Sequence, residues 1–419
     1  MNEQIKQRIV QLNNGEVPNG YEKTEFGIFP KDWVLKTIGE VSLVRGSYGL
    51  NAPACVYEEG LPKYLRITDI DENGNYINND AYVNHKESKN YILHENDIVF
   101  ARTGASVGKN YLYSSKDGEL SYAGFLIKFS IDETKCVPYM VKANCRGTRY
   151  DKWVQIMSTR SGQPGINAEE YADFCLIVPN SIEEQSKIAE ILMKWDEAIE
   201  LQEQYIQTLL SMKITYVDKF FCAPGEEKTK FDLLYKTAGE GGTPDTKKQA
   251  YYDSEDVPFV KIEHLAEKYI TKIDSYISNL GLQKSGAWLV PENCLIFSNG
   301  ATIGEASINK IPVATKQGIL GIVPSNVIDV EYFYYLVKSK YFLSKVKKIT
   351  TKGTMCTAYL KDINNLNLFI HGKEEQIKIA KILSLIDCLI EDEKKKVDVL
   401  KKQRKVLQQY LLNGIVRVK

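Results

Sequence analysis

The sequence predicts an α+β protein in which two duplicated mixed α/β domains are joined by two long coiled-coil helices. Three observations predict this class: an internal repeat, short β-rich runs ahead of each copy of the repeat, and apolar heptads within it. The decapeptide 183–192 (EEQSKIAEIL) returns as 374–383 (EEQIKIAKIL), with eight of ten positions identical. Weaker matches precede it in the same order, such as 104–108 with 300–304. An ordered repeat of this kind predicts two copies of one structural unit.

Short strands separated by Gly, Asn and Asp turn signals are expected before each decapeptide. The β-rich runs are Tyr64–Ile70, Asp97–Phe100, Phe125–Ile131 and Phe174–Val178 in the first copy, and Val257–Ile262 and Leu366–Ile370 in the second. A helix is expected near residues 1–14, because this segment echoes residues 402–414. We therefore predict a first domain at 1–180, a helix at 181–222, a second domain at 223–371 and a final helix at 372–419.

From each decapeptide onward the apolar residues follow a spacing of 3.5 residues, which predicts a coiled-coil helix. At 1.5 Å per residue, about 35 residues make a rod of roughly 52 Å. Polar residues interrupt both seams at equivalent places, Gln202 with Glu393 and Lys213 with Arg404, and would set register. The partner expected for each helix is the other copy; the alternative is that each packs only on its own domain. The seam residues are Ile188, Leu192, Trp195, Ile199, Ile206, Leu209, Ile379, Leu383, Ile386, Ile390, Val397, Leu400 and Leu407.

Composition excludes several classes of protein without choosing a function. The 54 basic and 54 acidic side chains balance, so any DNA-binding surface must be local. No apolar stretch approaches the ~20 residues that span a bilayer, and the N-terminus has no signal-peptide core, so we expect a cytoplasmic protein without membrane contact. The eight cysteines stand singly and are expected to be reduced thiols.

Motifs that carry chemistry are missing from the sequence. Residues 104–110 (GASVGKN) resemble a phosphate loop but are one residue short and end in Asn, and the second copy at 300–305 also lacks the lysine. A turn that brings backbone close to another segment explains these glycines better. The four histidines have no metal-ligand spacing, and no nucleophile elbow is present. We therefore expect no catalytic residue, metal or cofactor in this chain.

Polar glycine-rich loops with a cation or amide recur at equivalent places in both copies. Arg suits the guanine edge, Asn and Gln suit adenine, and Ser and Thr suit phosphates. Any one such loop can equally be a solvated turn, but recurrence in both copies favours binding. The DNA-binding candidates are Arg45, Ser47, Tyr48, Arg66, Arg102, Thr103, Ser106, Lys109, Arg160, Gln163, Thr243, Lys261, Asn299, Thr302, Lys352 and Thr354.

Two helix openings of the form Glu-Glu-Gln-x-Lys-Ile-Ala-x-Ile-Leu, each after an apolar strand (Cys175–Pro179 and Leu366–Ile370), are the most distinctive motif. The leader 20–33, the tripeptide 242–244, the strand Val257–Ile262 and the loop 299–304 accompany them. In these motifs, over nearly its whole length, the chain resembles the specificity subunits of type I restriction–modification systems. It departs from that family where Pro-Pro usually precedes the helix, with Pro179-Asn180 in one copy and His371-Gly372 in the other.

The resemblance implies two target-recognition domains, each reading half of a bipartite site in double-stranded DNA, held apart by an antiparallel helix pair. It implies no catalysis in this chain. Two methyltransferase subunits would dock on it and methylate adenine with S-adenosylmethionine, and restriction subunits would bring ATP and Mg²⁺ chemistry. A rod of the expected length corresponds to about one to two turns of duplex, so it would set the spacer. The rival functions are a coiled-coil adaptor without DNA contact and a catalytic part of the same system.

Overall fold

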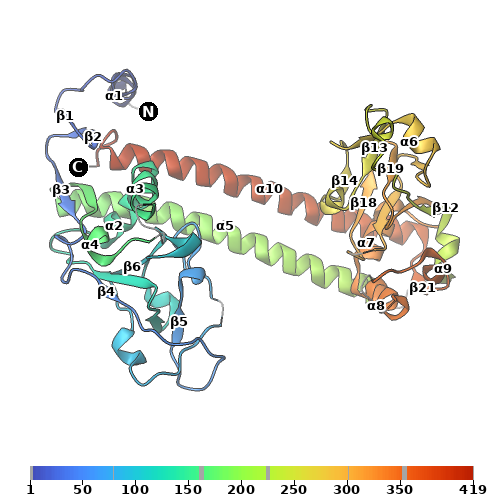
Figure 1. Cartoon of the computed structure of the whole chain (residues 1–419), viewed down its shortest axis with the longest axis horizontal. Helices are drawn as coiled ribbons and strands as arrows, with labels where there is room; N and C mark the ends of the chain where they lie inside the picture. Colours follow the sequence, from blue (N-terminus) through green and yellow to red (C-terminus); the bar gives the residue numbers. More distant parts are fainter. Residues whose placement is uncertain are drawn as a thin grey trace. The chain divides into compact units, whose positions relative to one another are not determined.

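The computed structural model describes residues 3–78, 80–159, 165–222, 227–300, 302–351 and 356–418 (Figure 1). The chain divides into two compact units: unit 1 comprises residues 1–201 and 397–419, and unit 2 comprises residues 202–396. Two long helices, α5 (Ile182–Cys222) and α10 (Lys373–Leu412), contribute to both units. Each unit combines short strands with helices and a length of both long helices, so the predicted α+β class is confirmed.

Unit 1 is built on a four-stranded sheet of order β4-β9-β6-β7, in which neighbouring strands are antiparallel. Two-stranded pairs flank it: β1 with β2, β10 with β3, and the parallel pair β5 with β8. The elements before α5 are α1 (Glu3–Asn13), β1 (Tyr21–Thr24), β2 (Gly27–Pro30), β3 (Trp33–Thr37), β4 (Ser47–Tyr48), β5 (Lys63–Leu65), β6 (Asp97–Ala101), β7 (Asn110–Leu112), β8 (Leu120–Tyr122), β9 (Leu126–Ser130), α2 (Pro138–Asn144), α3 (Thr148–Ser158), α4 (Ala168–Ala172) and β10 (Cys175–Pro179).

The core of unit 1 joins the sheet to the start of α5. Phe100 on β6 contacts the rings of Phe129 and Tyr171, with centroids 5.8 and 4.8 Å away. The same buried cluster continues to Ile188 and Leu192 on α5. Burying each such side chain contributes roughly 1.5–3 kcal/mol, so the domain and the helix fold as one body.

Unit 2 has a five-stranded sheet of order β12-β20-β17-β18-β14, a four-stranded sheet of order β15-β13-β19-β16 and the pair β11 with β21. An aromatic cluster of Phe231, Phe297, Phe333 and Phe342 fills its core. The elements between the long helices are β11 (Glu227–Lys230), β12 (Tyr235–Glu240), β13 (Val257–Val260), β14 (Tyr269–Ile270), β15 (Tyr276–Ile277), α6 (Asn279–Gln283), β16 (Leu289–Val290), β17 (Leu295–Ser298), β18 (Ala306–Asn309), β19 (Val313–Thr315), β20 (Ile319–Pro324), α7 (Val330–Lys338), α8 (Lys340–Ile349), α9 (Leu360–Ile363) and β21 (Asn367–Ile370).

The two units repeat one topology. The order β4-β9-β6-β7 in unit 1 corresponds to β12-β20-β17-β18 in unit 2, and the parallel pair β5 with β8 corresponds to β13 with β19. The strand before each long helix pairs antiparallel with an early strand, β10 with β3 and β21 with β11. The predicted duplication is therefore a duplication of structure as well as of sequence.

Two of the expected strands end earlier than the β-rich runs suggested. The run Tyr64–Ile70 is a strand only to Leu65, after which Ile67–Asp69 form a 3₁₀ turn; the run Val257–Ile262 is a strand only to Val260. The buried Asp69 carboxylate accepts hydrogen bonds from the Arg66 backbone N–H and guanidinium at 2.9 Å, which closes the turn. A side chain that caps a turn competes with strand pairing, and the apolar pattern does not report this.

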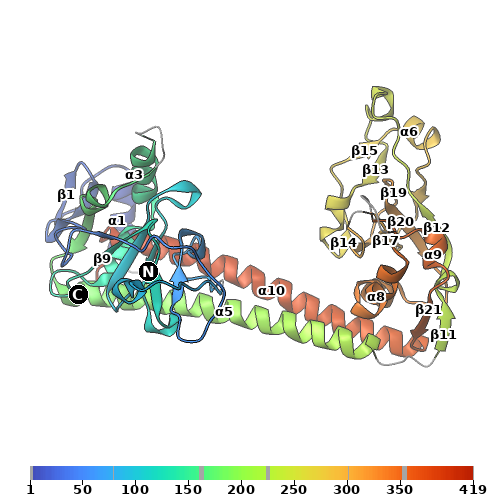
Figure 2. The same ribbon diagram turned by 60° about the horizontal axis from the view of Figure 1, so that its bottom comes forward.

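Within each unit α5 and α10 lie side by side in both views and run antiparallel (Figures 1 and 2). In unit 1, Glu184 near the start of α5 pairs with Arg417 beyond the end of α10, and Asp196 pairs with the earlier Arg404. In unit 2, Gln202 Nε2 donates to Glu393 at 2.5 Å. The seam residues Ile188, Leu192, Ile199, Ile206, Leu209, Ile379, Leu383, Ile386, Ile390 and Val397 are buried, and Trp195, Leu400 and Leu407 are half-buried.

The described helices include none with the length and apolar character that a bilayer crossing requires.

Candidate nucleic-acid interface

In unit 1 the predicted loops meet at one end of the main sheet, where β6 ends and β9 begins. The Arg102 backbone N–H donates to the Phe125 carbonyl at 3.0 Å, and its carbonyl accepts from the Ile166 N–H at 2.9 Å. The Tyr48 hydroxyl accepts a hydrogen bond from the Ala168 N–H at 3.3 Å. Segments far apart in sequence, near residues 48, 102, 125 and 166, therefore form one surface.

Arg102 stands at the centre of this end of the sheet. Its guanidinium lies over the Tyr48 ring, 4.7 Å from the centroid, in a cation–π contact. Its Nε is buried and has no hydrogen-bond partner among the residues described. Phe125 beside it is 58% exposed. A half-buried arginine stacked on one ring next to an exposed aromatic side chain offers donors and an apolar face to a base edge.

Other predicted cations of unit 1 are already paired within the domain. Arg45 binds Glu169 and Asp173 of the α4 region at 3.1 and 2.6 Å. Arg66 caps the turn at Asp69, and Lys109 pairs with Glu72 at 2.7 Å. Of the remaining candidates, the Ser47 hydroxyl lies 3.0 Å from the Tyr122 hydroxyl, Thr103 bridges to Gly165, and Ser106 lies half-buried in the turn after Thr103.

The last glycine of the loop 104–108, Gly108, serves close packing. Gly108 has a φ of +88°, and a Cβ there would lie 2.7 Å from the Val154 side chain. Gly304, at the same place in unit 2, has a φ of +106° and would meet Leu343 at 2.8 Å. Only glycine fits a left-handed backbone pressed against another segment. The predicted alternative to a phosphate loop, a turn brought close to another part of the fold, describes both copies.

Unit 2 gathers the corresponding segments at the corresponding end of its sheet. The Asn299 N–H donates to the Gly318 carbonyl at 3.1 Å, and the Asn299 carbonyl accepts from the Ala358 N–H at 2.9 Å. The Gly241 N–H donates to Ile319 at 2.9 Å, which brings the half-buried Thr243 loop to this end. By these hydrogen bonds Asn299 corresponds to Arg102, and Gly318 to Phe125.

Among the predicted residues of unit 2, Asn299 is less exposed than its counterpart Arg102. Asn299 is fully buried; its Nδ2 donates to the Ala358 carbonyl at 3.2 Å, while its Oδ1 has no partner within the described part of the chain. The Thr302 hydroxyl lies 3.2 Å from that of Ser298. Lys261 is half-buried beside a 3₁₀ turn, where its N–H donates to His264. Arg160, Gln163, Lys352 and Thr354 lie outside the described residues.

A model of the type I restriction modification DNA specificity domain matches residues 30–211 and 232–402, one match for each copy of the repeat. The chain belongs to the type I restriction–modification DNA specificity family. Its role is that of a specificity subunit, and an adaptor without DNA contact is not favoured.

The chain is similar to relatives and to solved structures over nearly its full length and theirs. The putative type I restriction enzyme MjaX specificity subunit of Methanocaldococcus jannaschii is 24% identical and covers 95% of this chain and 97% of its own. The MjaIX specificity subunit of the same organism is also 24% identical, with 95% and 96% covered. A chain of a type I restriction–modification system solved to explain its assembly has a TM-score of 0.59 at 14% identity, with 93% and 99% covered. The S subunit from M. genitalium has a TM-score of 0.55 at 15% identity, with 94% and 97% covered. These structures share the fold.

The glutamine that both copies of the repeated motif share joins each domain of this specificity subunit to its long helix. Gln185 is fully buried; its Oε1 accepts from the Val137 N–H at 2.9 Å and its Nε2 donates to the Pro179 carbonyl at 2.7 Å. Gln376 does the same with the Asp329 N–H at 2.8 Å and the His371 carbonyl at 2.8 Å. Buried backbone groups need hydrogen-bond partners, and the glutamine supplies them at the same place in both copies.

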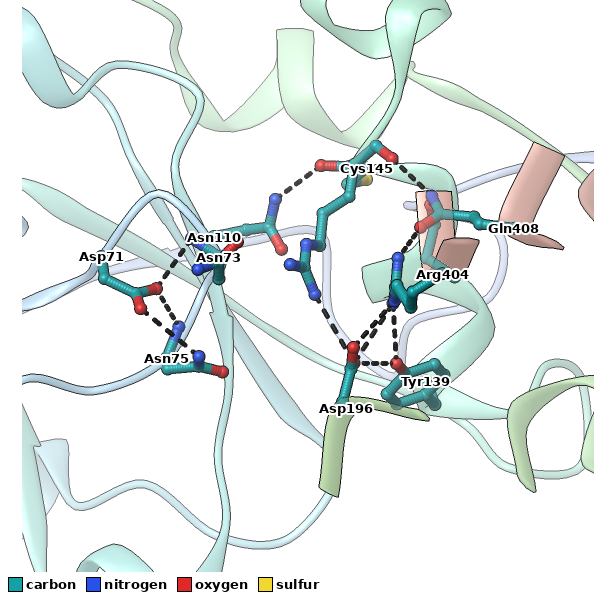
Figure 3. A network of polar contacts seen from close by, with 11 residues as sticks. Asp71, Asn73, Asn75, Asn110, Tyr139, Cys145, Asp196, Arg404 and Gln408 are labelled. Atoms are coloured by element: carbon teal, nitrogen blue, oxygen red, sulfur yellow. Dashed lines mark hydrogen bonds and ion pairs between the residues drawn. The ribbon is translucent and has the colours of Figure 1, made fainter. Parts of the chain in front are cut away.

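A second set of polar contacts joins the domain to both long helices in each unit, and Figure 3 shows the set in unit 1. In unit 1, Arg404 on α10 binds Asp196 on α5 at 2.7 Å and donates to the Tyr139 hydroxyl of α2 at 3.0 Å. In unit 2, Lys213 on α5 binds Asp387 on α10 at 2.6 Å, and the Tyr335 hydroxyl of α7 donates to Asp387 at 2.5 Å. Two of the polar seam residues that were predicted to set register, Lys213 and Arg404, thus also contact the helices of their own domains.

The pKa values of these groups follow from burial and partner charges. Burial raises the pKa of Tyr139, and the neighbouring Asp196 carboxylate raises it further, so the phenol remains a donor. Burial alone would raise the pKa of Asp196, but the Arg404 guanidinium and the Tyr139 hydroxyl hold it below its usual value of 3.8. In this triad of Tyr139, Asp196 and Arg404, the ion pair between Asp196 and Arg404 therefore persists throughout the neutral range.

Sequence reasoning missed the turns that precede β9 and β20. Phe125 was expected to begin a strand, but β9 begins at Leu126 and Phe125 projects from the turn before it. The signal available was the small pair Ala123-Gly124, which breaks the strand pattern. Residues 316–318 form the matching turn in unit 2, since the Ile319 N–H donates to the Lys316 carbonyl as the Leu126 N–H does to Ala123.

Proposed function

We propose that each unit of this chain reads one half of a bipartite site in double-stranded DNA. One observation carries the proposal: both units gather four equivalent segments at the same end of equivalent sheets, yet present different side chains there. Arg102 and Phe125 in unit 1 correspond to Asn299 and Gly318 in unit 2. Base edges are distinguished by the donors, acceptors and apolar groups that face them, so the two half-sites should differ.

The second part of the proposal concerns assembly. The long helices carry large apolar side chains on their exposed faces, including Met193, Leu201 and Tyr205 on α5 and Leu385 and Leu389 on α10. Exposed apolar patches favour protein contact. We infer that two methyltransferase subunits dock on the helices and methylate adenine, and that restriction subunits complete an endonuclease in the cytoplasm. S-adenosylmethionine, ATP and Mg²⁺ would be bound by those partners, not by this chain.

Replacing Arg102 by alanine should relax or abolish recognition of one half-site. Losing a specific base contact costs about 1–3 kcal/mol of discrimination, roughly a 5- to 150-fold change. Adenine-methylation sequencing of a host that expresses the chain with its methyltransferase partner would measure the preference at every position. We expect the half-site read by unit 2 to keep its sequence preference.

A matched control is Lys116→Ala, which removes an exposed cation from the turn between β7 and β8, at the opposite end of the β6–β7 hairpin from Arg102. Both half-site preferences should survive this change. Equal loss at both half-sites in Arg102→Ala would contradict two separate readers.

Adding one heptad to each long helix should lengthen the spacer and leave both half-sites unchanged. Gln202 and Glu393 face one another, so insertion after both keeps the seam in register. Seven residues add about 10 Å, or about three base pairs. Methylation mapping on a randomised site library would measure the spacer. Insertion in one helix alone, the control, should abolish methylation; an unchanged spacer in the double insertion would show that the helices do not set the distance.

A further inference from the structure

Unit 1 contains a group of cations away from the Arg102 surface, around the turn at residues 70–75. Lys109 Nζ donates to the Ile70 carbonyl at 3.3 Å. A Cβ on Gly74 in the same turn would lie 3.6 Å from Lys142 Cε. Arg146, in the bend between α2 and α3, lies 3.7 Å from Asp196. Two cationic side chains, Lys109 and Lys142, therefore approach this turn, and Arg146 is close enough to Lys142 to act on its charge.

Lys142 is the unusual member of this group. It is only 9% exposed, and no residue in the described ranges accepts a hydrogen bond from its ammonium. Burial, together with a smaller effect of the Arg146 guanidinium, lowers the pKa of Lys142 to about 8. An ammonium on a largely buried side chain that makes no hydrogen bond to the described residues is costly unless solvent or a ligand contacts it.

The nearby carboxylates are occupied by other partners. Asp71 accepts from the Asn73 N–H at 2.8 Å and the Asn75 N–H at 2.7 Å, and Asp196 is held by Arg404 and Tyr139 (Figure 3). Glu72 pairs with Lys109 from an exposed position. The cations around Lys142 therefore outnumber the carboxylates, which leaves a positive charge that these residues do not balance.

Unit 2 shows that the fold itself does not require these cations. Val137 and Asp329 occupy equivalent places, because their N–H groups donate to Gln185 and Gln376. Counting five and nine residues onward, Lys142 corresponds to Tyr334, which is buried, and Arg146 corresponds to Lys338.

The residue that pairs with Lys338 in unit 2 is acidic, whereas its counterpart in unit 1 is basic. Lys338 pairs with Glu305 at 3.0 Å. Glu305 follows Gly304 as Lys109 follows Gly108, and the two glycines make the same backbone hydrogen bond to the end of β17 and β6. Unit 2 therefore has one acid, one tyrosine and one lysine where unit 1 has three cations.

We propose that Lys142 and Arg146, with Lys109 beside them, form a binding site for a phosphate group in unit 1. A phosphate oxygen would accept from the Lys142 ammonium and add negative charge to a cluster whose carboxylates, Asp71 and Asp196, already accept hydrogen bonds from other groups. The phosphate can come from a DNA phosphodiester or from free phosphate, since both present the same oxygens. A carboxylate of a partner protein is the competing ligand.

The first test compares inorganic phosphate with chloride at matched ionic strength, using the full chain at pH ~7.5 and its thermal midpoint as the readout. Phosphate should raise the midpoint of the unaltered chain, and Lys142→Met should abolish that rise while increasing the midpoint without phosphate. Lys338→Met, the control at the paired lysine of unit 2, should keep the rise. If phosphate does not raise the thermal midpoint of the unaltered chain more than chloride does, the proposal is overturned. A carboxylate of a partner protein is then the ligand to test for this site.

A second variant guards against poor folding of the first. Arg146→Gln should weaken phosphate binding about tenfold in a calorimetric titration, which is the effect of one charge-assisted hydrogen bond. Phosphate bound equally well by the unaltered chain and by both Arg146→Gln and Lys142→Met would place the anion elsewhere and overturn the proposal.

Sulfate gives a readout that a purely structural lysine would not produce. Its charge is constant from pH ~7 to ~9.5, and the groups facing Lys142, namely Arg146, Arg404, Asp71 and Asp196, belong to classes that do not titrate there. Sulfate affinity should fall across this range as Lys142 loses its proton. A constant affinity would contradict a role for Lys142.

Duplex DNA of unrelated sequence separates the two sources of phosphate. If the site takes a DNA phosphodiester, Lys142→Met should reduce the slope of log K against log salt by about one, and Lys338→Met should not. An unchanged slope together with the phosphate-specific rise assigns the site to free phosphate. Neither result depends on sequence recognition, so the site and the proposed bipartite reading can fail independently.

Discussion

Replacing Arg404 by methionine should lower the free energy of unfolding by about 1.5–3 kcal/mol, because the half-buried Asp196 carboxylate loses its closest counter-ion and keeps only Arg146, 3.7 Å away. Arg404 is 7% exposed and makes two hydrogen bonds to Asp196, at 2.7 and 3.1 Å. It also donates to Tyr139 and Gln408, and Gln408 Nε2 in turn donates to the Ala143 carbonyl at 2.9 Å. Urea unfolding of the full chain, followed by circular dichroism, would measure the loss.

Two substitutions calibrate this effect. Lys402→Met removes a cation from an exposed position of the same helix and should change stability by less than about 0.5 kcal/mol. Lys213→Met breaks the equivalent pair in unit 2, where the cation is more exposed than Arg404, and should cost less than Arg404→Met. A loss in Arg404→Met no larger than that in Lys402→Met would show that the triad does not stabilise unit 1.

The triad also predicts a pH dependence. The pKa of Asp196 in the folded chain lies below its usual 3.8, so the unfolded chain binds the proton more readily. The contribution of Asp196 to the free energy of unfolding is complete above pH ~5. It is lost as the pH falls through 3.8 toward the pKa of Asp196 in the folded chain. Arg404→Met should therefore lose stability less steeply in acid than the unaltered chain does.

Replacing Gln185 by leucine should cost about 2–5 kcal/mol, because two buried backbone groups lose their partners. The leucine has nearly the same volume, so no cavity forms, but the Val137 N–H and the Pro179 carbonyl are left without the hydrogen bonds that Gln185 makes. We expect α2 to loosen from the start of α5. Native-state hydrogen exchange should show faster exchange in 137–144 before the rest of unit 1.

The controls for Gln185→Leu lie on the same helix and in the other unit. Gln207→Leu makes the same chemical change at an exposed position of α5 and should be nearly neutral. Gln376→Leu should loosen α7 in unit 2 in the same way, since Gln376 binds the Asp329 N–H. Equal exchange in residues 137–144 of Gln185→Leu and the unaltered chain would contradict the fastening role.

The strands show where sequence reasoning reaches its limit. Asp97–Phe100 and Phe174–Val178 were predicted within one residue of β6 and β10, because both are continuous apolar runs buried on both faces. Tyr64–Ile70 was predicted too long, because the Arg66–Asp69 contact turns the chain and leaves no mark on the apolar pattern. Local periodicity reports burial, whereas a side-chain cap depends on geometry.

Some residues of the candidate interface could be predicted from the sequence, and others could not. Arg102 and Asn299 were predicted from the recurrence of their loops, and the structure puts them at equivalent sheet ends. The engagement of Arg45 with Glu169 and Asp173 could not be predicted, because those carboxylates lie more than a hundred residues away in the sequence. Phe125 was missed because one residue decides whether it belongs to the strand or to the turn.

The sequence by itself determined the duplication, the fold class and the two long helices, because repeats and heptads are written in residue order and need no distances. Only the tertiary structure decided which cations are neutralised and which are left over. Lys109, Lys142 and Arg146 carry no common motif, and their grouping, like the contrast with Glu305, Tyr334 and Lys338, depends on contacts between segments remote in sequence. Electrostatic energy depends on the distance between charges and on their burial, and neither is local in the chain.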